Sequence, residues 1–194
     1  MEPTGAKKAK SLPRLDPIQR IVAAIAAGIA VIPLISSGEE SRSVITPEPN
    51  VSVSYNAKDL VGSWALVSVV TERDGIKSDT YGPTAKGFLV FDANGRYSII
   101  FVAGSLPKFE VENRSRGTAD ENKAVVAGSL AHFGTYVVDE TDKSFTFQVV
   151  RATFPNWEAR SLKRSFVVTG DVLRFTDPHA SAGGVATTTF ERAK

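Results

Sequence analysis

The chain of 194 residues is 42% hydrophobic and 23% charged. This favours one globular domain, with or without an appendage, and excludes collagen-like, coiled-coil and wholly disordered chains. Cysteine is absent and the only histidines are His132 and His179. Disulfides, thiolate chemistry, cysteine-bound metals and a three-histidine metal centre are therefore excluded. We expect neither a metal nor any other cofactor.

Positive charge is concentrated near the N-terminus. The formal net charge is +2, but residues 1–38 alone have a net charge of +3, which leaves the remainder slightly acidic. Affinity for nucleic acid depends on Lys and Arg side chains that displace counterions from phosphates. A near-neutral body offers no such basic stripe, so the sequence predicts no nucleic-acid partner.

Residues 1–38 have the pattern of an export segment. A basic stretch precedes residues 21–35, which hold no charged or strongly polar group, and small polar residues follow. This order is typical of a secretory signal peptide. Without cleavage, residues 21–35 would serve as a membrane anchor, although a span usually takes about 20 apolar residues. A buried core helix or a misassigned start are the alternatives. We expect an exported protein, periplasmic or extracellular, or one anchored to the inner membrane.

Residues 39–58 are predicted to form a flexible linker. They are polar, with scattered valines and two prolines separated by one residue, Pro47 and Pro49. Proline at this spacing disfavours a helix, and so little apolar surface cannot offset the entropy lost on ordering. The folded domain is therefore expected to occupy residues 59–194.

The remainder of the sequence alternates short strand-forming runs with turn residues. Runs rich in Val, Ile, Phe, Thr and Tyr are separated by clusters of Gly, Asp, Asn and Pro, which is typical of antiparallel strands joined by tight turns. Strands are predicted at residues 60–72, 86–91, 96–102, 133–138, 144–152, 161–168, 172–176 and 185–192. Because open sheet edges invite aggregation, these strands should close into a barrel or form a sandwich.

One segment departs from this pattern. Thr118 and Glu121 have the spacing of a capping box, which predicts that a helix begins at about residue 119 and continues to about residue 131. Val126, Leu130 and Phe133 follow at intervals of four and three residues. This spacing predicts an apolar stripe that packs the helix against the sheet.

Five motifs in order resemble the lipocalin-like domain family, a divergent group of small barrel proteins of the calycin type in bacteria and fungi. The first is Gly62-Ser63-Trp64, similar to the Gly-x-Trp motif of lipocalins, and the others are residues 82–89, 134–140, 154–157 and 190–192. The resemblance covers residues 60–192. It implies an all-β fold, an antiparallel eight-stranded barrel with one helix between strands three and four. A barrel of this size encloses side chains alone or one small ligand.

The resemblance also implies how the barrel closes. In lipocalins a Trp of the first strand meets an Arg of the last strand, and the matching residues here are Trp64 and Arg192. An indole is large enough to plug one end of a barrel, and a guanidinium stacked on it adds a cation–π contact. We expect Gly62, Trp64 and Arg192 to close the barrel rather than to bind a ligand.

Inward-facing positions on the predicted strands suggest a ligand site. Apolar side chains with polar tips suit a mainly hydrophobic small molecule held by one or two hydrogen bonds. The predicted ligand-binding residues are Ser68, Tyr97, Phe101, His132, Tyr136, Phe147 and Trp157. Trp157 follows a Pro-Asn turn and forms either part of a lid at the barrel mouth or a structural corner.

Motifs of the common enzyme classes are missing from the sequence. It contains no nucleophile elbow, zinc-protease helix, phosphate-binding Gly-rich loop or dinucleotide fingerprint, so no catalytic residue is predicted. The sequence favours binding of a small hydrophobic ligand in the barrel. One alternative is an isomerase or cyclase that uses the same cavity, with His132 or Tyr136 as proton donor or acceptor. The other is a structural module with a filled barrel.

Overall fold

The structure of the protein is a computed structural model that describes residues 53–194. The predicted export segment, residues 1–38, lies outside the described residues, as does the predicted linker up to residue 52. The strands are β1 Val53–Ser54, β2 Gly62–Arg73, β3 Ile76–Asp79, β4 Lys86–Phe91, β5 Arg96–Val102, β6 Ser129–Asp139, β7 Ser144–Ala152, β8 Ser161–Thr169, β9 Val172–Asp177 and β10 Val185–Arg192. The helices are α2 Ala57–Leu60 and α3 Ala119–Gly128, with 3-10 turns η1 Arg114–Arg116 and η2 Pro155–Trp157.

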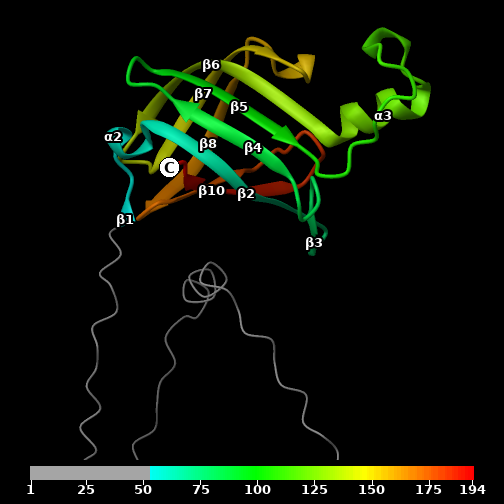
Figure 1. The fold of residues 1–194 in the computed structure, drawn as a ribbon. Helices are drawn as coiled ribbons and strands as arrows, with labels where there is room; N and C mark the ends of the chain where they lie inside the picture. Colours follow the sequence, from blue (N-terminus) through cyan, green and yellow to red (C-terminus); the bar gives the residue numbers. More distant parts are fainter. Residues whose placement is uncertain (1–52) are drawn as a thin grey trace, which may run out of the picture. The chain divides into compact units, whose positions relative to one another are not determined.

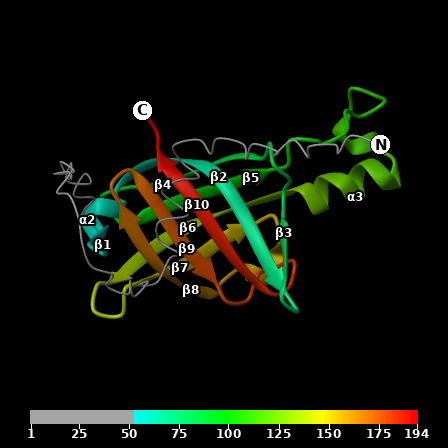
Figure 2. The ribbon, with the colours of Figure 1, turned by 90° about the horizontal axis from the view of Figure 1, so that it is seen from below.

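Eight of these strands form a closed antiparallel barrel, as predicted. Their order is β2-β4-β5-β6-β7-β8-β9-β10, and β10 pairs with β2 to complete the circle. Figures 1 and 2 show the sheet curving round until the last strand lies beside the first long one. The short strands β1 and β3 add to β8 and β2. Tight turns with left-handed residues such as Gly95 and Gly170 join consecutive strands, which explains why neighbours in sequence pair in space.

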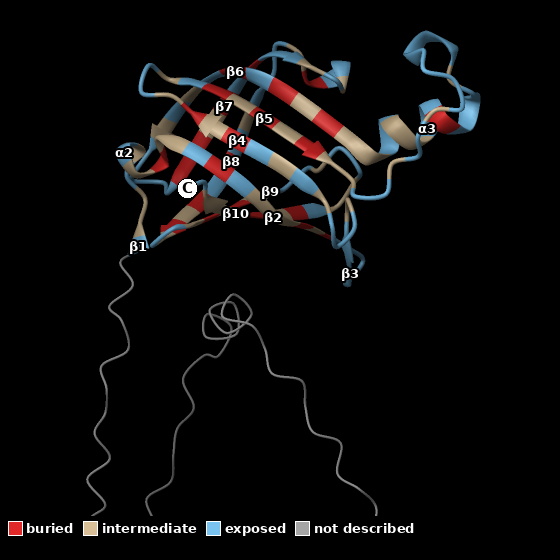
Figure 3. Ribbon diagram, viewed as in Figure 1, coloured by how far each residue is buried: buried red, intermediate tan, exposed pale blue. Residues whose placement is uncertain are grey.

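Side chains alternate between the two faces of each strand. Along β5, Tyr97, Ile99 and Phe101 are buried, whereas the residues between them are only half-buried. The alternation is visible as red segments along the strands in Figure 3. Because successive side chains of a strand point to opposite faces, this pattern places one face of every strand inside the barrel. The interior is therefore the hydrophobic core.

Trp64 and Arg192 lie at the end of the barrel next to α2. They are register partners on β2 and β10, and the guanidinium carbon of Arg192 lies 4.1 Å from the centre of the Trp64 ring. Arg192 also donates to the carbonyls of Asp59 at 2.8 Å and Val61 at 3.1 Å. Gly62 has a φ of 130°, and a Cβ there would lie 3.0 Å from Arg192 Nη1. Glycine at this position therefore permits the close approach of the arginine.

Helix α3 begins as predicted but differs at its C-terminal end. The Thr118 side chain accepts from the Glu121 N–H, and the Glu121 carboxylate accepts from the Thr118 N–H, which is the expected capping box. The helix ends at Gly128, however, and residues 129–131 belong to β6.

The predicted apolar stripe of the helix is wrong. The Val126 side chain is 78% exposed, and Leu130 and Phe133 belong to β6 rather than to α3. Because these two strand residues are three apart, they face opposite sides, with Leu130 inside and Phe133 outside. The helix instead projects beyond the barrel (Figure 1).

Residues 53–58 also differ from the prediction of a linker. Val53 and Ser54 pair with Thr169 and Val168 of β8. Tyr55 packs edge-to-face on the ring of Phe166, with centroids 6.2 Å apart. This aromatic contact attaches the segment to the barrel, so the folded domain begins before residue 59.

Candidate functional site

The barrel interior is filled near α2 and hollow toward its other end. The rings of Phe91, Phe145 and Phe147 pack on one another with centroid separations of 4.7–5.9 Å. Beyond them lies a cavity of about 50 Å³, which reaches the surface beside the β9–β10 loop, where Ser181 and Ala182 are exposed. It is lined by Val69, Thr71, Thr80, Tyr81, Ile99, Phe101, Leu130, His132, Trp157, Arg164, Phe175, Asp177, Ala180, Ser181, Ala182, Ala186 and Thr188. This wall is more polar than the sequence predicted.

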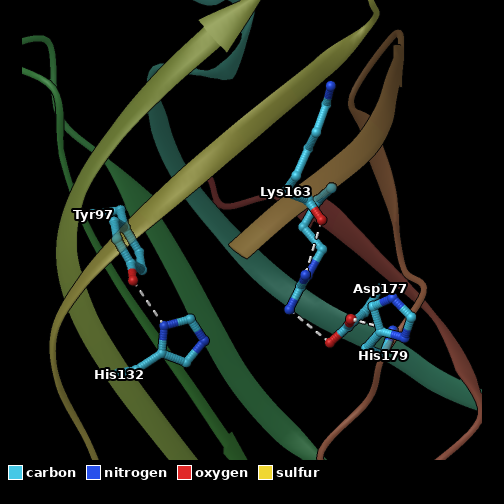
Figure 4. Close-up of polar contacts among 6 residues, drawn as sticks. Tyr97, His132, Lys163, Asp177 and His179 are labelled. Atoms are coloured by element: carbon cyan, nitrogen blue, oxygen red, sulfur yellow. Dashed lines mark hydrogen bonds and ion pairs between the residues drawn. The ribbon is translucent and has the colours of Figure 1, made fainter. Parts of the chain in front are cut away.

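His132 and Tyr97 form a buried hydrogen-bonded pair on adjacent strands. The Tyr97 hydroxyl lies 2.9 Å from His132 Nδ1, and the rings meet edge-to-face with centroids 5.4 Å apart (Figure 4). Burial raises the pKa of Tyr97 above its ordinary value. Burial also lowers the pKa of His132 to about 3, and the positive charge of Arg164 adds to this effect. The imidazole is therefore neutral at physiological pH.

A buried ion pair forms another side of the cavity. Arg164 Nη2 donates to Asp177 Oδ2 at 2.7 Å, and the two side chains are only 6% and 9% exposed. Arg164 Nη1 donates to the carbonyl of Lys163 at 2.9 Å. Asp177 Oδ1 accepts from the backbone N–H of His179 at 2.9 Å (Figure 4). Burial lowers the pKa of Arg164, and the Asp177 carboxylate opposes that change.

Five of the predicted ligand-binding residues lie in or directly beneath the cavity. Phe101, His132 and Trp157 line it. The rings of Tyr97 and Phe147 stack with centroids 3.9 Å apart, and both pack against His132. Phe147 and Tyr97 thus support the His132 ring from behind and do not themselves form the cavity wall.

The expected inward position of Ser68 is wrong because of a β-bulge. Ser68 pairs with Thr189, but the next pair is Leu66 with Phe190, so Val67 is an extra residue in β2. The bulge shifts the alternation by one, and Val69 and Thr71 face the cavity instead. Ser68 therefore lies on the outer face.

Tyr136 lies at the end of the barrel remote from the cavity. Its hydroxyl donates to the carbonyl of Asp92 at 2.9 Å, and its ring packs edge-to-face on Phe91 at 4.6 Å. Asp92 belongs to the turn between β4 and β5, on the side of α2. Tyr136 therefore does not line the cavity, in contrast to the inward ligand-facing position that was expected for it.

Sequence reasoning missed Arg164 and Asp177, although alternation could have found both. Arg164 lies two residues before the buried Phe166 on β8, and Asp177 lies two residues after the buried Phe175 on β9. Side chains two apart on a strand share a face. Counting from either Phe would have placed both charges inside, where they must pair.

A larger depression of about 320 Å³ lies on the outer face of β5, β6 and β7. Its wall includes the exposed side chains of Phe133 and Arg151. Arg151 is engaged by Glu158 at the surface, with their charged atoms 2.6 Å apart. The interior cavity is the better candidate site because it gathers buried polar groups of five strands.

Comparison with known proteins identifies the family. A family model of the lipocalin-like domain matches residues 61–193. The chain belongs to the lipocalin-like domain family. No curated protein matches this lipocalin-like chain. Lipocalin-type barrels of eight strands can hold one small ligand in the interior, and here the cavity occupies that place.

Two features are absent from residues 53–194 of this lipocalin-like protein. No helix in this part of the chain is long and apolar enough to cross a membrane. Over the same residues, no three His, Asp or Glu side chains are grouped so that they could hold a metal ion.

The lowered pKa of His132 makes stability depend on pH. The unfolded chain binds a proton at this residue below about pH 6.5, whereas the folded state does not until about pH 3. The free energy of unfolding is therefore highest above pH 6.5 and decreases as the pH falls from 6.5 toward 3. His132 should contribute a loss of about 1.4 kcal/mol per pH unit below 6.5, or about 2 kcal/mol between pH 7 and pH 5.

Urea unfolding at pH 7 and pH 5 measures this loss. His132→Gln should flatten the pH dependence, and His179→Gln, a change at an exposed loop residue, should leave it as in the wild type. Equal pH dependence in the wild type and His132→Gln would contradict a neutral buried imidazole.

Proposed function

We propose that this protein binds a small amphipathic molecule in the cavity at the open end of its barrel. The proposal rests on one observation: buried polar groups face an otherwise apolar cavity. Phe101, Leu130 and Trp157 offer apolar surface, and His132 and the Arg164–Asp177 pair lie beside them. Burying such polar groups is costly. A cavity with apolar walls and a few placed polar groups is the usual composition of a ligand site.

The size of the cavity limits what enters without movement. Sites for drug-sized ligands measure about 300–1,000 Å³, whereas this cavity measures about 50 Å³. A molecule of more than a few atoms requires Tyr81 or residues 180–182 at the mouth to move. The Arg73 guanidinium donates to the carbonyl of Ala182, which holds the β9–β10 loop against the end of β2. Breaking this exposed contact would free the loop.

Two observations favour binding over acid–base catalysis. Tyr136 lies at the closed end, away from the cavity. His132, with a pKa of about 3, is a weak base near neutral pH, where an efficient proton-transfer group has a pKa close to 7. An isomerase or cyclase using either residue therefore has less support than a binding protein. The cavity is the one observation that favours a binding protein over a structural module with a filled barrel.

We further propose that the protein is exported. The support is the basic segment followed by the uncharged apolar residues 21–35, which lie outside the described residues. Cleavage after this stretch would release residues 53–194 to the periplasm or the exterior, and a chain that keeps it would remain anchored to the inner membrane. The ligand would then be a molecule of that compartment.

Native mass spectrometry of the full-length gene product, purified from its own host, tests both proposals. We expect the chain to lack its N-terminal segment, or to fractionate with membranes, and to carry a bound small molecule. Ala186→Leu, which adds volume at a buried cavity position, should abolish the bound mass. Ala65→Leu, at an exposed position of β2, should retain it. A wild-type protein without bound mass would indicate the filled-barrel alternative, and a full-length soluble chain would contradict export.

A further inference from the structure

The cavity contains hydrogen-bond donors that the protein does not use. His132 binds Tyr97 through Nδ1, and its Nε2 has no partner within residues 53–194. Arg164 donates through Nη1 and Nη2, but its Nε–H has no partner in the same part of the chain. Among the side-chain nitrogens and oxygens of residues 53–194, only Arg174 Nε is both fully buried and without a partner. His132 Nε2 and Arg164 Nε also lack a partner, so neither of them is fully buried. Both therefore reach open space, and both residues line the cavity.

The bond to Tyr97 determines which ring nitrogen of His132 carries the proton. The Tyr97 hydroxyl has one partner within residues 53–194, His132 Nδ1. If the hydroxyl donates, Nδ1 accepts and the proton of the neutral ring is on Nε2. If it accepts, the hydroxyl hydrogen stays unpaired in a buried place, which is energetically costly. The first arrangement avoids this cost, so His132 presents an N–H to the cavity.

Figure 4 shows the direction of this donor. Tyr97 lies on one side of the His132 ring, and the second ring nitrogen is on the side toward Asp177. Arg164 holds Asp177 there at 2.7 Å. His132, Arg164 and Asp177 all line the cavity, and the ring nitrogen of His132 that does not bind Tyr97 is the one turned toward Asp177.

The charges around this space cancel. Arg164 and Asp177 are the only charged residues in the cavity wall formed by residues 53–194, and they neutralise each other. A ligand carboxylate placed beside them would bring a buried charge without a counterion, which is costly. A neutral acceptor satisfies the two donors without that cost.

We propose that the cavity binds a neutral molecule by its carbonyl oxygen, which accepts hydrogen bonds from His132 Nε2 and Arg164. One carbonyl oxygen has two lone pairs and can accept from both donors. The rest of the molecule lies against Phe101, Leu130 and Trp157 toward the mouth. This inference specifies the ligand class of the proposed binding function and rests on it.

Three compounds of equal chain length test the inference: 2-octanone, 2-octanol and octanoate. Each is titrated into the isotopically labelled protein while the imidazole nitrogens of His132 and the indole N–H of Trp157 are followed by NMR. Before addition, His132 should show the neutral form protonated at Nε2. We expect 2-octanone to bind at least tenfold more tightly than octanoate and to shift the Nε2 signal. His132→Phe should weaken 2-octanone binding about tenfold, the value of one hydrogen bond.

Two controls separate the possible failures. Tyr136→Phe removes a polar group at the closed end and should leave 2-octanone binding unchanged. Tighter binding of octanoate or 2-octanol, equal binding to His132→Phe, or a ring protonated at Nδ1 would overturn the carbonyl inference while ligand binding stands. If none of the three compounds binds and the native protein carries no bound mass, the binding function itself fails.

Discussion

Replacing Arg164 by Met is expected to lower the free energy of unfolding by about 3–5 kcal/mol. The change leaves the Asp177 carboxylate buried at 9% exposure with no counterion. Removing one partner of a buried pair costs far more than the pair itself contributes, because the remaining charge stays desolvated. Urea unfolding at pH 7, followed by circular dichroism, measures the loss.

Two comparisons show whether the cost arises from the unpaired charge. The double variant Arg164→Met/Asp177→Asn keeps an oxygen for the His179 N–H and removes the charge, so it should recover most of the lost stability. Arg151→Met removes the partner of Glu158 in a pair whose arginine is 69% exposed, and it should cost at most about 1 kcal/mol. If Arg164→Met costs no more than Arg151→Met, the cavity is open enough to solvate Asp177.

The barrel could be predicted from sequence because turns and strand alternation depend on residues that are close together in the chain. Gly95 and Gly170 adopt left-handed conformations in tight turns, and such turns force the strands on either side to pair. Alternation then shows which residues point inward, as on β5 with Tyr97, Ile99 and Phe101. Local signals of this kind are additive along the chain, and together they specify the order of the strands.

Two of the wrong predictions concern positions where a local sequence pattern is overridden by pairing between strands. The helix spacing of Val126, Leu130 and Phe133 was overridden when residues 129–131 paired with β5. The bulge at Val67 is a property of the pairing between β2 and β10, so the alternation of β2 alone could not place Ser68. Tyr136 was assigned to the correct face but to the wrong end, because alternation gives no depth along the barrel axis.

The ligand site combines strands that are distant in sequence. His132 comes from β6, whereas Arg164 and Asp177 come from β8 and β9. Barrel closure brings these strands round one space, and no short motif records that proximity. Closure at the α2 end is therefore a condition for the site at the open end.

Trp64→Ala should consequently be the most damaging change at the closed end, lowering the free energy of unfolding by about 3–5 kcal/mol. Trp64 is fully buried, and its Nε1 donates to the carbonyl of Leu60 at 2.8 Å. The substitution leaves a cavity, removes the donor to that carbonyl and removes the ring on which Arg192 stacks at 4.1 Å. Chemical unfolding of the wild type and the variant measures the loss.

A double-mutant cycle with Arg192→Met isolates the stacking contribution, for which we expect a coupling of about 0.5–2 kcal/mol. Trp157→Ala is the matched control, because it removes the other tryptophan from the rim of the cavity, where a cavity already exists. It should cost less than Trp64→Ala. Equal losses for the two tryptophans, or zero coupling between Trp64 and Arg192, would show that the barrel does not depend on this closure. In that case the geometry of the cavity at the open end would not depend on the Trp64–Arg192 contact at the closed end.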